Sequence, residues 1–371
     1  MARKTLRRLD DMVRSHLLKV DTYSSMDAPE ILAQKAGISP NKIIKLNGNE
    51  NPFGPSPKAV EAVANVDLHI YPDPNQEKMR EALSGYTGLG PEKIVVGAGA
   101  DELIDLLFRL FISPGEIILD FDPTFGMYSF CAGVSGAKVE YIDRDENFDI
   151  DVEAALSRVS DNTKMIFVTS PNNPTGNPVR EDQVLELLKS GLIVVVDEAY
   201  FEFSGSTMQN LVGDYKNLII LRTMSKWAGL AGLRVGYGLM HEEVANYLMD
   251  IKPPYNVNIA GEAALVASLE DSEYLLSNVR KIVLERDRMY RLLDDIDGVV
   301  PWPSEGNYIL CQFNENRAGK VYEALASRGI FVRNFPSKKL RDFFRIAVGM
   351  PDETSLLVKS VEEIMREIEN E

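Results

Sequence analysis

Residues 192–203 read LIVVVDEAYFEF, and residues 218–238 read LIILRTMSKWAGLAGLRVGYG. Each stretch starts as an apolar, β-branched run and changes abruptly to polar side chains, which is typical of a buried strand that ends beside a ligand. The polar residues delivered in this way are Asp197, Tyr200, Ser225, Lys226 and, after a Gly/Ala-rich turn, Arg234. The two stretches therefore predict adjacent buried strands whose ends share one site.

These side chains match the needs of a pyridoxal phosphate site. The Lys226 amine can form a Schiff base with the cofactor aldehyde, and the Asp197 carboxylate can keep the pyridine nitrogen protonated. Ser225 and Arg234 can hold the phosphate, and Tyr200 can bond the ring hydroxyl. We therefore expect pyridoxal phosphate as the cofactor, with Lys226, Asp197 and Tyr200 as the catalytic residues.

Each of these assignments has an ordinary structural alternative. A carboxylate after a strand often caps the next helix, most lysines are solvated surface charges, and a loop tyrosine can simply pack on its own domain. Lys226, however, lies between an apolar run and Trp227, where an ammonium is costly unless its pKa falls. A lowered pKa suits a Schiff-base lysine and general base, which favours the functional interpretation.

A third segment, VVGAGADELIDLLFRLF at residues 95–111, adds a candidate phosphate turn. Small residues separate a predicted strand from a predicted helix, so backbone N–H groups near Gly99 and Asp101 can meet a phosphate. A dinucleotide-binding turn fits this spacing loosely, but the third glycine of that fingerprint is missing and no Walker motif occurs.

Two more loops follow predicted strands. In SPNNPTGNP (170–178), Asn173 can present its amide to the ring hydroxyl opposite Tyr200. In DPTFGMY (122–128), Phe125 can stack on the cofactor ring. A rigid turn and a buried loop aromatic are the ordinary alternatives for these two loops.

The order of elements predicts an α/β fold with two domains. Short apolar runs alternate with helical patterns such as Asp101–Phe111 and Arg180–Lys189, which favours a large domain with a mostly parallel, seven-stranded sheet sandwiched by helices. The seven predicted strands are Ile94–Gly97, Glu116–Phe121, Ala137–Ile142, Lys164–Ser170, Leu192–Asp197, Leu218–Thr223 and Val235–Met240.

The pattern changes near residue 261 and predicts a second, smaller α/β domain. Its predicted elements are a long helix at Glu262–Ile296, strands at Tyr308–Phe313, Ile330–Arg333 and Phe343–Val348, and helices at Gly319–Arg328 and Glu353–Glu369. The expected division is therefore an N-terminal arm (1–40) whose amphipathic helix packs with the small domain, a large cofactor-binding domain (41–260) and a small C-terminal domain (261–371).

The composition excludes several classes of protein. The formal net charge of −16 over 371 residues would repel a nucleic-acid backbone. The chain has two cysteines, interpreted as reduced core thiols, and three histidines in no ligand spacing, so we expect neither a disulfide nor a metal site. No signal peptide and no stretch of transmembrane length is found, which favours a cytoplasmic enzyme with no membrane association.

Taken together, the motifs resemble the fold-type-I pyridoxal-phosphate-dependent aminotransferases and, within them, the histidinol-phosphate aminotransferase family. The resemblance extends over nearly the whole chain. The matching segments are LNGNENPFGPSP (46–57), YPDP (71–74), GADE (99–102), PTFGMYS (123–129), SPNNPTG (170–176), DEAYFEF (197–203), RTMSKWAGLAGLRVGYG (222–238) and FRIAVG (344–349). One departure is Trp227–Ala228, where the family often has Ala-Phe after the lysine.

The resemblance implies further site residues. It implies a homodimer in which Tyr71 reaches the phosphate bound by the partner subunit, and phosphate contacts from Ala100 and Asp101. It also implies that Arg345 binds the anionic group of the substrate and that Arg333 helps to hold a substrate phosphate. Tyr23 matches loosely an arm tyrosine that lies over the substrate.

From the residues alone, Arg345 is already unusual, because it lies inside an apolar strand. A guanidinium there needs an anionic partner, which a ligand or a buried structural ion pair can supply.

The expected function is transamination of L-histidinol phosphate with 2-oxoglutarate, giving imidazole-acetol phosphate and glutamate, in histidine biosynthesis. Close alternatives are an aromatic amino-acid aminotransferase and a threonine-phosphate decarboxylase of the same family. A non-catalytic sensor that binds the cofactor, and a nucleotide-dependent oxidoreductase, are the alternatives from other classes.

Overall fold

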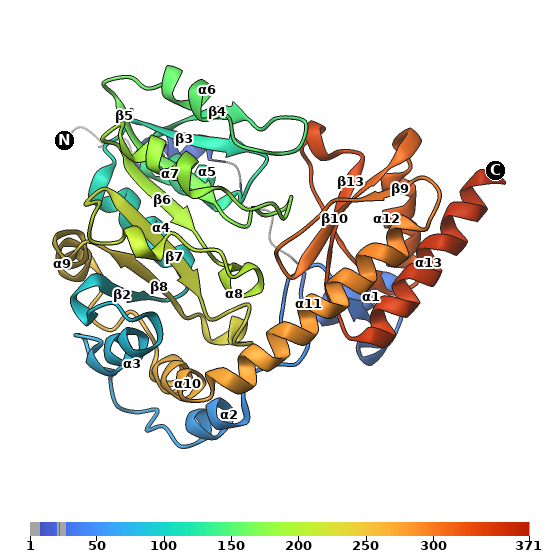
Figure 1. Ribbon diagram of the computed structural model, residues 1–371, viewed down its shortest axis with the longest axis horizontal. Helices are drawn as coiled ribbons and strands as arrows, with labels where there is room; N and C mark the ends of the chain where they lie inside the picture. The colour runs from blue at the N-terminus through green and yellow to red at the C-terminus, as the bar shows by residue number, and fades with distance from the viewer. Residues whose placement is uncertain (1–7, 21, 23–26, 371) are drawn as a thin grey trace, which may run out of the picture.

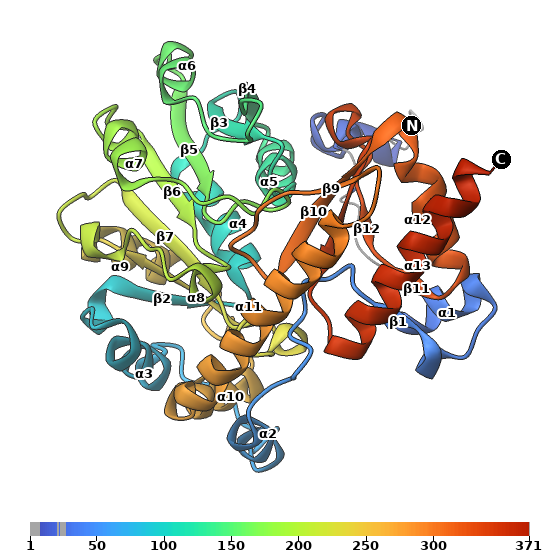
Figure 2. The same ribbon diagram turned by 45° about the vertical axis from the view of Figure 1, so that its right-hand side comes forward.

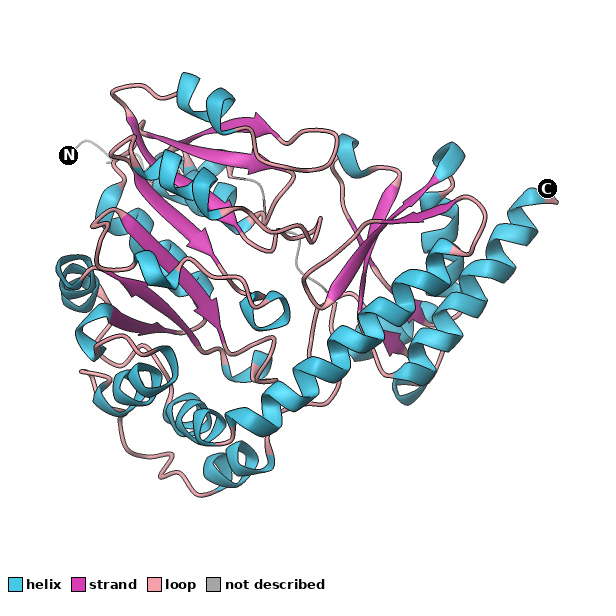
Figure 3. Cartoon of the chain, in the orientation of Figure 1, coloured by secondary structure: helices cyan, strands magenta, loops and turns pink. Residues whose placement is uncertain are grey.

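The computed structural model describes residues 8–20, 22 and 27–370 and divides the chain into a large α/β unit and a smaller one (Figure 1, Figure 3). The large unit is built on a seven-stranded sheet in the order β2-β8-β7-β6-β5-β3-β4. Its strands are β2 (Ile94–Gly97), β3 (Ile117–Asp122), β4 (Lys138–Asp143), β5 (Thr163–Thr169), β6 (Ile193–Asp197), β7 (Leu218–Thr223) and β8 (Gly236–Met240). The prediction of seven strands is confirmed to within a few residues at each end.

The sheet is mostly parallel, as expected, with one exception. Strand β8 pairs antiparallel with both β2 and β7, whereas the other neighbouring strands pair in parallel. The carboxyl ends of β5, β6 and β7 therefore meet at one edge, with Thr169 beside Asp197 and Asp197 beside Leu221 in the strand register. This edge is where ligands bind in open parallel sheets.

Helices cover both faces of the sheet, which explains why its strands are apolar throughout. Along β6, Val195 belongs to one buried cluster, and its neighbours Val194 and Val196 belong to the other. The helices of the large unit are α2 (Pro57–Ala64), α3 (Glu77–Thr87), α4 (Ala100–Phe111), α5 (Met127–Ser135), α6 (Val152–Ser157), α7 (Glu181–Leu188), α8 (Phe201–Ser204), α9 (Glu242–Ile251) and α10 (Ile259–Glu270).

The smaller unit has a four-stranded antiparallel sheet in the order β12-β13-β10-β9. Its elements are α11 (Ser272–Asp294), β9 (Val299–Pro301), β10 (Tyr308–Phe313), α12 (Ala318–Ser327), β11 (Ile330–Phe331), β12 (Arg333–Asn334), β13 (Phe343–Ala347) and α13 (Pro351–Glu369).

Two details of this half differ from the predictions. The single helix expected over residues 262–296 is two helices, because the backbone leaves the helical region at Asp271, with φ −113° and ψ 24°. The strand expected over 330–333 is divided between two sheets, since β11 pairs with β1 (Ile44–Lys45) and β12 pairs with β13.

The N-terminal arm also differs from its prediction. In place of an amphipathic helix, the described part of residues 1–20 holds two short 3₁₀ turns, Leu9–Asp11 and Leu17–Lys19. Leu9 and Met12 are 75% and 68% exposed, so packing does not supply the burial that a short helix needs for stability.

The arm contacts both units of the protein. The ring nitrogen Nε2 of His16 lies 3.2 Å from the carbonyl oxygen of Val134 in the large unit. Helix α1 (Pro29–Ala36) and β1 lie beside the small unit (Figure 2), where β1 pairs with β11. Residues 29–45 thus lie against the small unit, whereas His16 contacts the large one.

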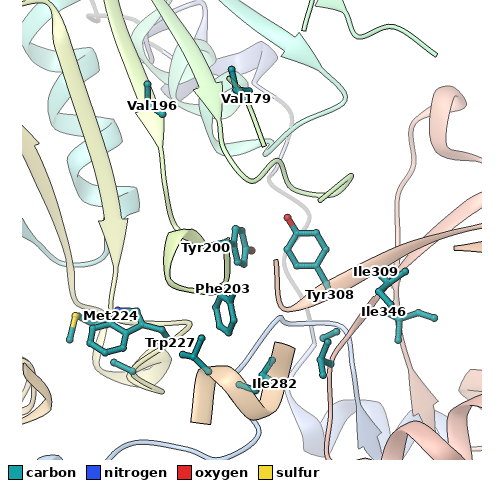
Figure 4. Close-up of a cluster of buried hydrophobic side chains, with 14 of the residues drawn as sticks. Val179, Val196, Tyr200, Phe203, Met224, Trp227, Ile282, Tyr308, Ile309 and Ile346 are labelled. Atoms are coloured by element: carbon teal, nitrogen blue, oxygen red, sulfur yellow. The ribbon is translucent and has the colours of Figure 1, made fainter. Parts of the chain in front are cut away.

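The two units share one buried core. Figure 4 shows Tyr200 of the large unit facing Tyr308 of β10, with Ile282 of α11 below them. The two tyrosine rings meet edge to face, with centroids 4.9 Å apart. Both cysteines are buried and free, and no helix among the described residues has the length and apolarity to cross a membrane.

Candidate active site

A cavity of about 890 Å³ lies between the carboxyl edge of the large sheet and the small unit. This volume suits a small molecule of cofactor and substrate size. Eleven of the predicted site residues line it, namely Ala100, Asp101, Phe125, Asn173, Asp197, Tyr200, Ser225, Lys226, Arg234, Arg333 and Arg345. Positions far apart in the sequence thus converge on one chamber.

Asp197 ends β6 and is 4% exposed. Its Oδ2 accepts a hydrogen bond of 2.7 Å from the Tyr128 hydroxyl, and its Oδ1 accepts one of 3.0 Å from the backbone N–H of Ala199. Burial raises its pKa from 3.8 to about 6, against the lowering effect of these two bonds. The N-cap of the following helix is Tyr200 rather than Asp197, so helix capping does not explain this carboxylate.

Lys226 lies three residues beyond the end of β7 and is not a solvated surface charge. Its ammonium donates a hydrogen bond of 3.0 Å to the carbonyl oxygen of Gly48. Burial, and after it the positive charge of Arg345, lower its pKa from 10.5 to about 8. About a tenth of the amine is therefore in the neutral, nucleophilic form at pH 7.

The turn between β2 and α4 forms an anion-binding cradle with Arg234. The Arg234 guanidinium donates from Nη2 to Asp101 Oδ2 at 2.8 Å and from Nη1 to Ser225 Oγ at 3.4 Å. Gly99 has φ +84°, and a Cβ atom there would lie 2.6 Å from Arg234 Nη2. Ala100 and Asp101 are the first residues of α4, whose N–H groups have no partner within the helix. The cradle thus offers a hydroxyl, a guanidinium and helix N–H groups.

The opposite wall carries two arginines from the small unit. Arg333 of β12 and Arg345 of β13 are direct partners in the antiparallel register, so their side chains share one face of the sheet. Arg345 is 6% exposed and donates to the Asn47 carbonyl oxygen at 2.9 Å and to Asn173 Oδ1. A guanidinium held in this way can bind an anionic ligand.

Aromatic side chains complete the walls. Phe125 is half-buried and contacts Tyr128 edge to face, with ring centroids 5.7 Å apart. The Tyr200 hydroxyl accepts a hydrogen bond of 2.9 Å from the Asn49 amide, and the Lys226 ammonium lies 5.9 Å from the Tyr200 ring centroid. Asn173, predicted to offer its amide to a ring hydroxyl, has its oxygen engaged by Arg345.

Two predicted residues, Gly99 and Tyr71, are not among the residues that line the cavity, and a third lies outside the described residues. Gly99 supports the cradle from behind, next to Arg234. Tyr71 is 76% exposed and stacks on Tyr255, with ring centroids 4.5 Å apart. Tyr23 lies outside the described residues. Trp227, the departure from the family pattern, is fully buried and stacks on Tyr86 at 5.3 Å, away from the cavity.

Several residues of the cavity were not predicted as site residues. Gly48, Asn49 and Glu50 line it and belong to the segment 46–57, which the sequence marks only as a family match. Asn172 is fully buried, and its amide nitrogen donates to the Pro123 carbonyl oxygen at 3.0 Å and to Thr175 Oγ1 at 2.7 Å, which fixes one loop against another. The dense Asn, Gly and Pro content of both loops was the available signal, because such loops form rigid turns.

A metal site finds no support in the part of the chain that the structure describes. No three His, Cys, Asp or Glu side chains gather there in a way that could hold a metal ion. The charged groups of the cavity are instead arranged as an amine, a carboxylate and separate guanidinium groups.

Comparison with known proteins identifies the family. Residues 41–358 match the family model for aminotransferase class I and II. The chain is 44% identical over 363 residues to a histidinol-phosphate aminotransferase of Roseiflexus castenholzii, which covers 95% of this chain and 98% of that protein. It is 42% identical over 358 residues to histidinol-phosphate aminotransferase 1, chloroplastic, of Arabidopsis thaliana, covering 95% of this chain and 86% of that protein.

The fold has a matching solved structure. The histidinol-phosphate aminotransferase of Sinorhizobium meliloti, determined in complex with pyridoxal-5′-phosphate, aligns with a TM-score of 0.86 at 26% identity and covers 93% of this chain and 96% of that one. The sequence and the fold agree, and the chain belongs to the class I and II aminotransferases, within the histidinol-phosphate aminotransferase family.

Proposed function

We propose that this aminotransferase uses pyridoxal phosphate to transfer the amino group of L-histidinol phosphate to 2-oxoglutarate, as a step of histidine biosynthesis. The observation that carries the proposal is the placement of two arginines, Arg333 and Arg345, in the same cavity as Lys226. One chamber thus combines an amine of lowered pKa with a guanidinium pair suited to a substrate phosphate or carboxylate.

The residues of the site fit the cofactor. Lys226 would be the amine that attaches the aldehyde, Asp197 would accept a hydrogen bond from the pyridine nitrogen, and Ser225 and Arg234 would hold the phosphate. The glycine at position 99 supports this fit, because a side chain there would displace the Arg234 guanidinium from the cradle. Once bound, pyridoxal phosphate supplies a protonated ring that withdraws electrons from the carbon bearing the substrate amine.

Lys226 performs the proton transfer. Its pKa of about 8 leaves part of the amine neutral near neutral pH, so Nζ can accept the proton from the amine-bearing carbon of the substrate. The Gly48 carbonyl oxygen, 3.0 Å from Nζ, orients the amine. An exposed lysine with the usual pKa of 10.5 would be almost wholly protonated and unable to act as this base.

Asp197 maintains a negative charge at the floor of the site. Its pKa of about 6 leaves the carboxylate ionised at neutral pH, and the Tyr128 hydroxyl favours that charged form. A buried carboxylate of this kind prefers a cationic partner, which the protonated ring nitrogen provides. Tyr200 and Asn173, on the loops after β6 and β5, stand where they can bond the ring hydroxyl.

The two arginines bind the anionic end of either substrate. Arg345, oriented by Asn47 and Asn173, takes the carboxylate of 2-oxoglutarate or the phosphate of histidinol phosphate. Arg333 adds a second guanidinium for the doubly charged phosphate. The ring of Phe335 lies 5.9 Å from the guanidinium carbon of each arginine and keeps this part of the wall in place.

We further propose that the enzyme is a homodimer in which Tyr71 reaches the phosphate bound by the partner subunit. Leu68, Ile70 and Tyr71 are exposed together, at 79%, 55% and 76%, beside the half-exposed Tyr255. An apolar patch of this kind is typical of a protein–protein interface. Sedimentation analysis should give a dimer, and a monomeric active enzyme would contradict this arrangement.

The function is tested by the visible spectrum of the purified, cofactor-loaded protein. Adding histidinol phosphate without any keto acid should abolish the yellow colour, and 2-oxoglutarate should restore it. A yellow protein that ignores histidinol phosphate but is bleached by an aromatic amino acid would retain the aminotransferase and exclude the histidine pathway. Release of carbon dioxide from threonine phosphate would instead identify a decarboxylase.

A further inference from the structure

A polar network outside the cavity connects the phosphate cradle to two surface loops. Gln76 is 1% exposed and begins α3 in the left-handed region, with φ +57°. Its side-chain oxygen accepts from the Val96 N–H at 2.9 Å, and its amide nitrogen donates to the Val96 carbonyl oxygen at 2.6 Å. Gln76 therefore pairs with the edge strand β2 at its carboxyl end, one residue before the cradle turn begins.

Asn256 extends this network to the turn itself. Its side-chain oxygen accepts from Gln76 Nε2 at 2.9 Å, and its amide nitrogen donates to the Val96 carbonyl oxygen at 3.0 Å. The same amide nitrogen donates to Glu102 Oε2 at 2.8 Å. Glu102 Oε2 in turn accepts a hydrogen bond of 2.5 Å from the backbone N–H of Ala98.

These contacts determine the shape of the turn between β2 and α4. Val96 at the strand end is held by two side-chain amides, and Ala98 inside the turn is held by the Glu102 carboxylate. The N–H groups of Ala100 and Asp101 then point outward at the start of α4, where a phosphate would bind. An anion-binding turn is more effective when its N–H groups are already oriented before the ligand arrives.

We propose that Asn256, together with Gln76 and Glu102, is a positioning residue for the cofactor phosphate. Asn256 places the Glu102 carboxylate against Ala98 and so holds the cradle in its binding shape. The proposal rests on the proposed cofactor and adds to it a residue that touches neither cofactor nor substrate. Gln76 and Asn256 also follow Tyr71 and Tyr255 in their respective loops, so the same anchor supports the aromatic pair of the proposed interface.

The experiment compares the affinity of the cofactor-free full-length protein for pyridoxal phosphate and for pyridoxal, which lacks the phosphate. Both aldehydes attach to Lys226, so the ratio of the two dissociation constants reports phosphate binding alone. We expect Asn256→Ala to weaken pyridoxal phosphate binding about tenfold, the effect of losing one or two hydrogen bonds, and to leave pyridoxal binding unchanged. For the same reason, inorganic phosphate should compete less strongly with pyridoxal phosphate for binding to Asn256→Ala.

Asn217→Ala is the matched control. Asn217 is also half-buried, and its amide nitrogen also donates two hydrogen bonds, here to the carbonyl oxygens of Leu188 and Leu192. It lies before β7, at the opposite edge of the sheet from the cradle. Its loss should lower stability by a similar amount and leave the ratio of the two affinities at the wild-type value.

An isosteric variant controls for the possibility that Asn256→Ala misfolds. Asn256→Asp keeps the size of the side chain but sets a second carboxylate against Glu102, so the preference for the phosphorylated ligand should fall again. In the double variant Asn256→Asp/Glu102→Gln, the amide at position 102 donates to the carboxylate at position 256, so the hydrogen bond forms with donor and acceptor exchanged. Part of the preference for pyridoxal phosphate over pyridoxal should then return. A purely structural role would give no such recovery.

The possible outcomes separate the two proposals. An unchanged affinity ratio in Asn256→Ala, or an equal loss for both aldehydes, overturns the positioning role and leaves the cofactor assignment intact. A wild-type protein that binds pyridoxal phosphate no better than pyridoxal overturns the cofactor assignment itself, and the positioning role with it.

Discussion

The floor of the cavity and its arginine wall are built in different ways. The floor residues Asp197 and Lys226 stand at or just after the ends of adjacent strands of one large sheet, β6 and β7. The wall residues Arg333 and Arg345 belong to a second sheet and reach the cavity because the small unit packs across it. The chemistry of the site is therefore local to one rigid sheet, whereas recognition of the anion depends on how two units meet.

The largest expected effect is at the floor. Lys226→Ala removes both the point of cofactor attachment and the proton acceptor, so kcat should fall by more than about 10⁴-fold. Single-turnover spectroscopy with histidinol phosphate measures the loss, and dialysis measures whether the cofactor is still retained. Turnover of Lys226→Ala at the wild-type rate would contradict the assignment of Lys226 as the residue that attaches the cofactor and accepts the proton.

A smaller and more selective effect is expected at the wall. Arg345→Ala removes a charged partner of the substrate anion but no group of the floor, so kcat/KM should fall about 10²-fold. The bound cofactor should be retained, because Lys226, Ser225 and Arg234 are unchanged. Arg341→Ala, an exposed arginine of the same unit paired with Asp342, is the control and should leave kcat/KM at the wild-type value. Loss of the bound cofactor from Arg345→Ala would show that cofactor binding also depends on the arginine wall.

The pH dependence of cofactor attachment tests the lowered pKa of Lys226 at the floor of the cavity. The Lys226 pKa is lowered to about 8, so the reactive neutral amine increases as pH rises through 8 and is nearly complete at pH 9. The rate at which the cofactor-free protein takes up pyridoxal phosphate should rise about tenfold between pH 7 and pH 9 and then level off. Stopped-flow absorbance measures it. A rate that keeps rising up to pH 10.5 would mean that burial does not perturb this lysine.

The smallest effect on catalysis is expected for Trp227, which is buried in the core and does not line the cavity. Trp227 follows the reactive lysine but points into the core, and its ring nitrogen is buried with no hydrogen-bond partner among the described residues. Trp227→Phe should therefore lower the free energy of unfolding by about 1–3 kcal/mol through lost packing and leave kcat/KM unchanged. Thermal unfolding and steady-state kinetics measure the two quantities. A fall in kcat/KM without a change in stability would place the indole in the site after all.

The elements that were predicted well carry their signal in a few neighbouring residues. The seven strands of the large sheet appear as apolar runs because both faces are covered, and Asp197 and Lys226 appear as abrupt polar residues at their ends. The same local logic failed for the N-terminal arm, whose amphipathic pattern does not become a helix because its apolar side chains are not buried. The local pattern was also insufficient at residues 330–334, where the predicted single strand is two short strands that pair in different sheets.

Other parts of the site had no local signal. Tyr128 is an unremarkable helix residue in the sequence, and only the fold places its hydroxyl 2.7 Å from Asp197. Asn256 lies 154 positions from Glu102, yet the two side chains are bonded. Contacts of this range depend on chain closure and packing, which no periodicity or spacing encodes.

The sequence by itself determined the α/β class and the large sheet, because strand periodicity and burial act over a few residues. It also predicted the amine, the carboxylate and the phosphate ligands at the strand ends. It also supplied the resemblance that pointed to Arg333 and Arg345. Only the tertiary structure decided which side chains orient them, where the arm lies and which groups share one cavity. Those decisions depend on contacts between segments distant in the chain, whose energies exist only once the two units have packed together.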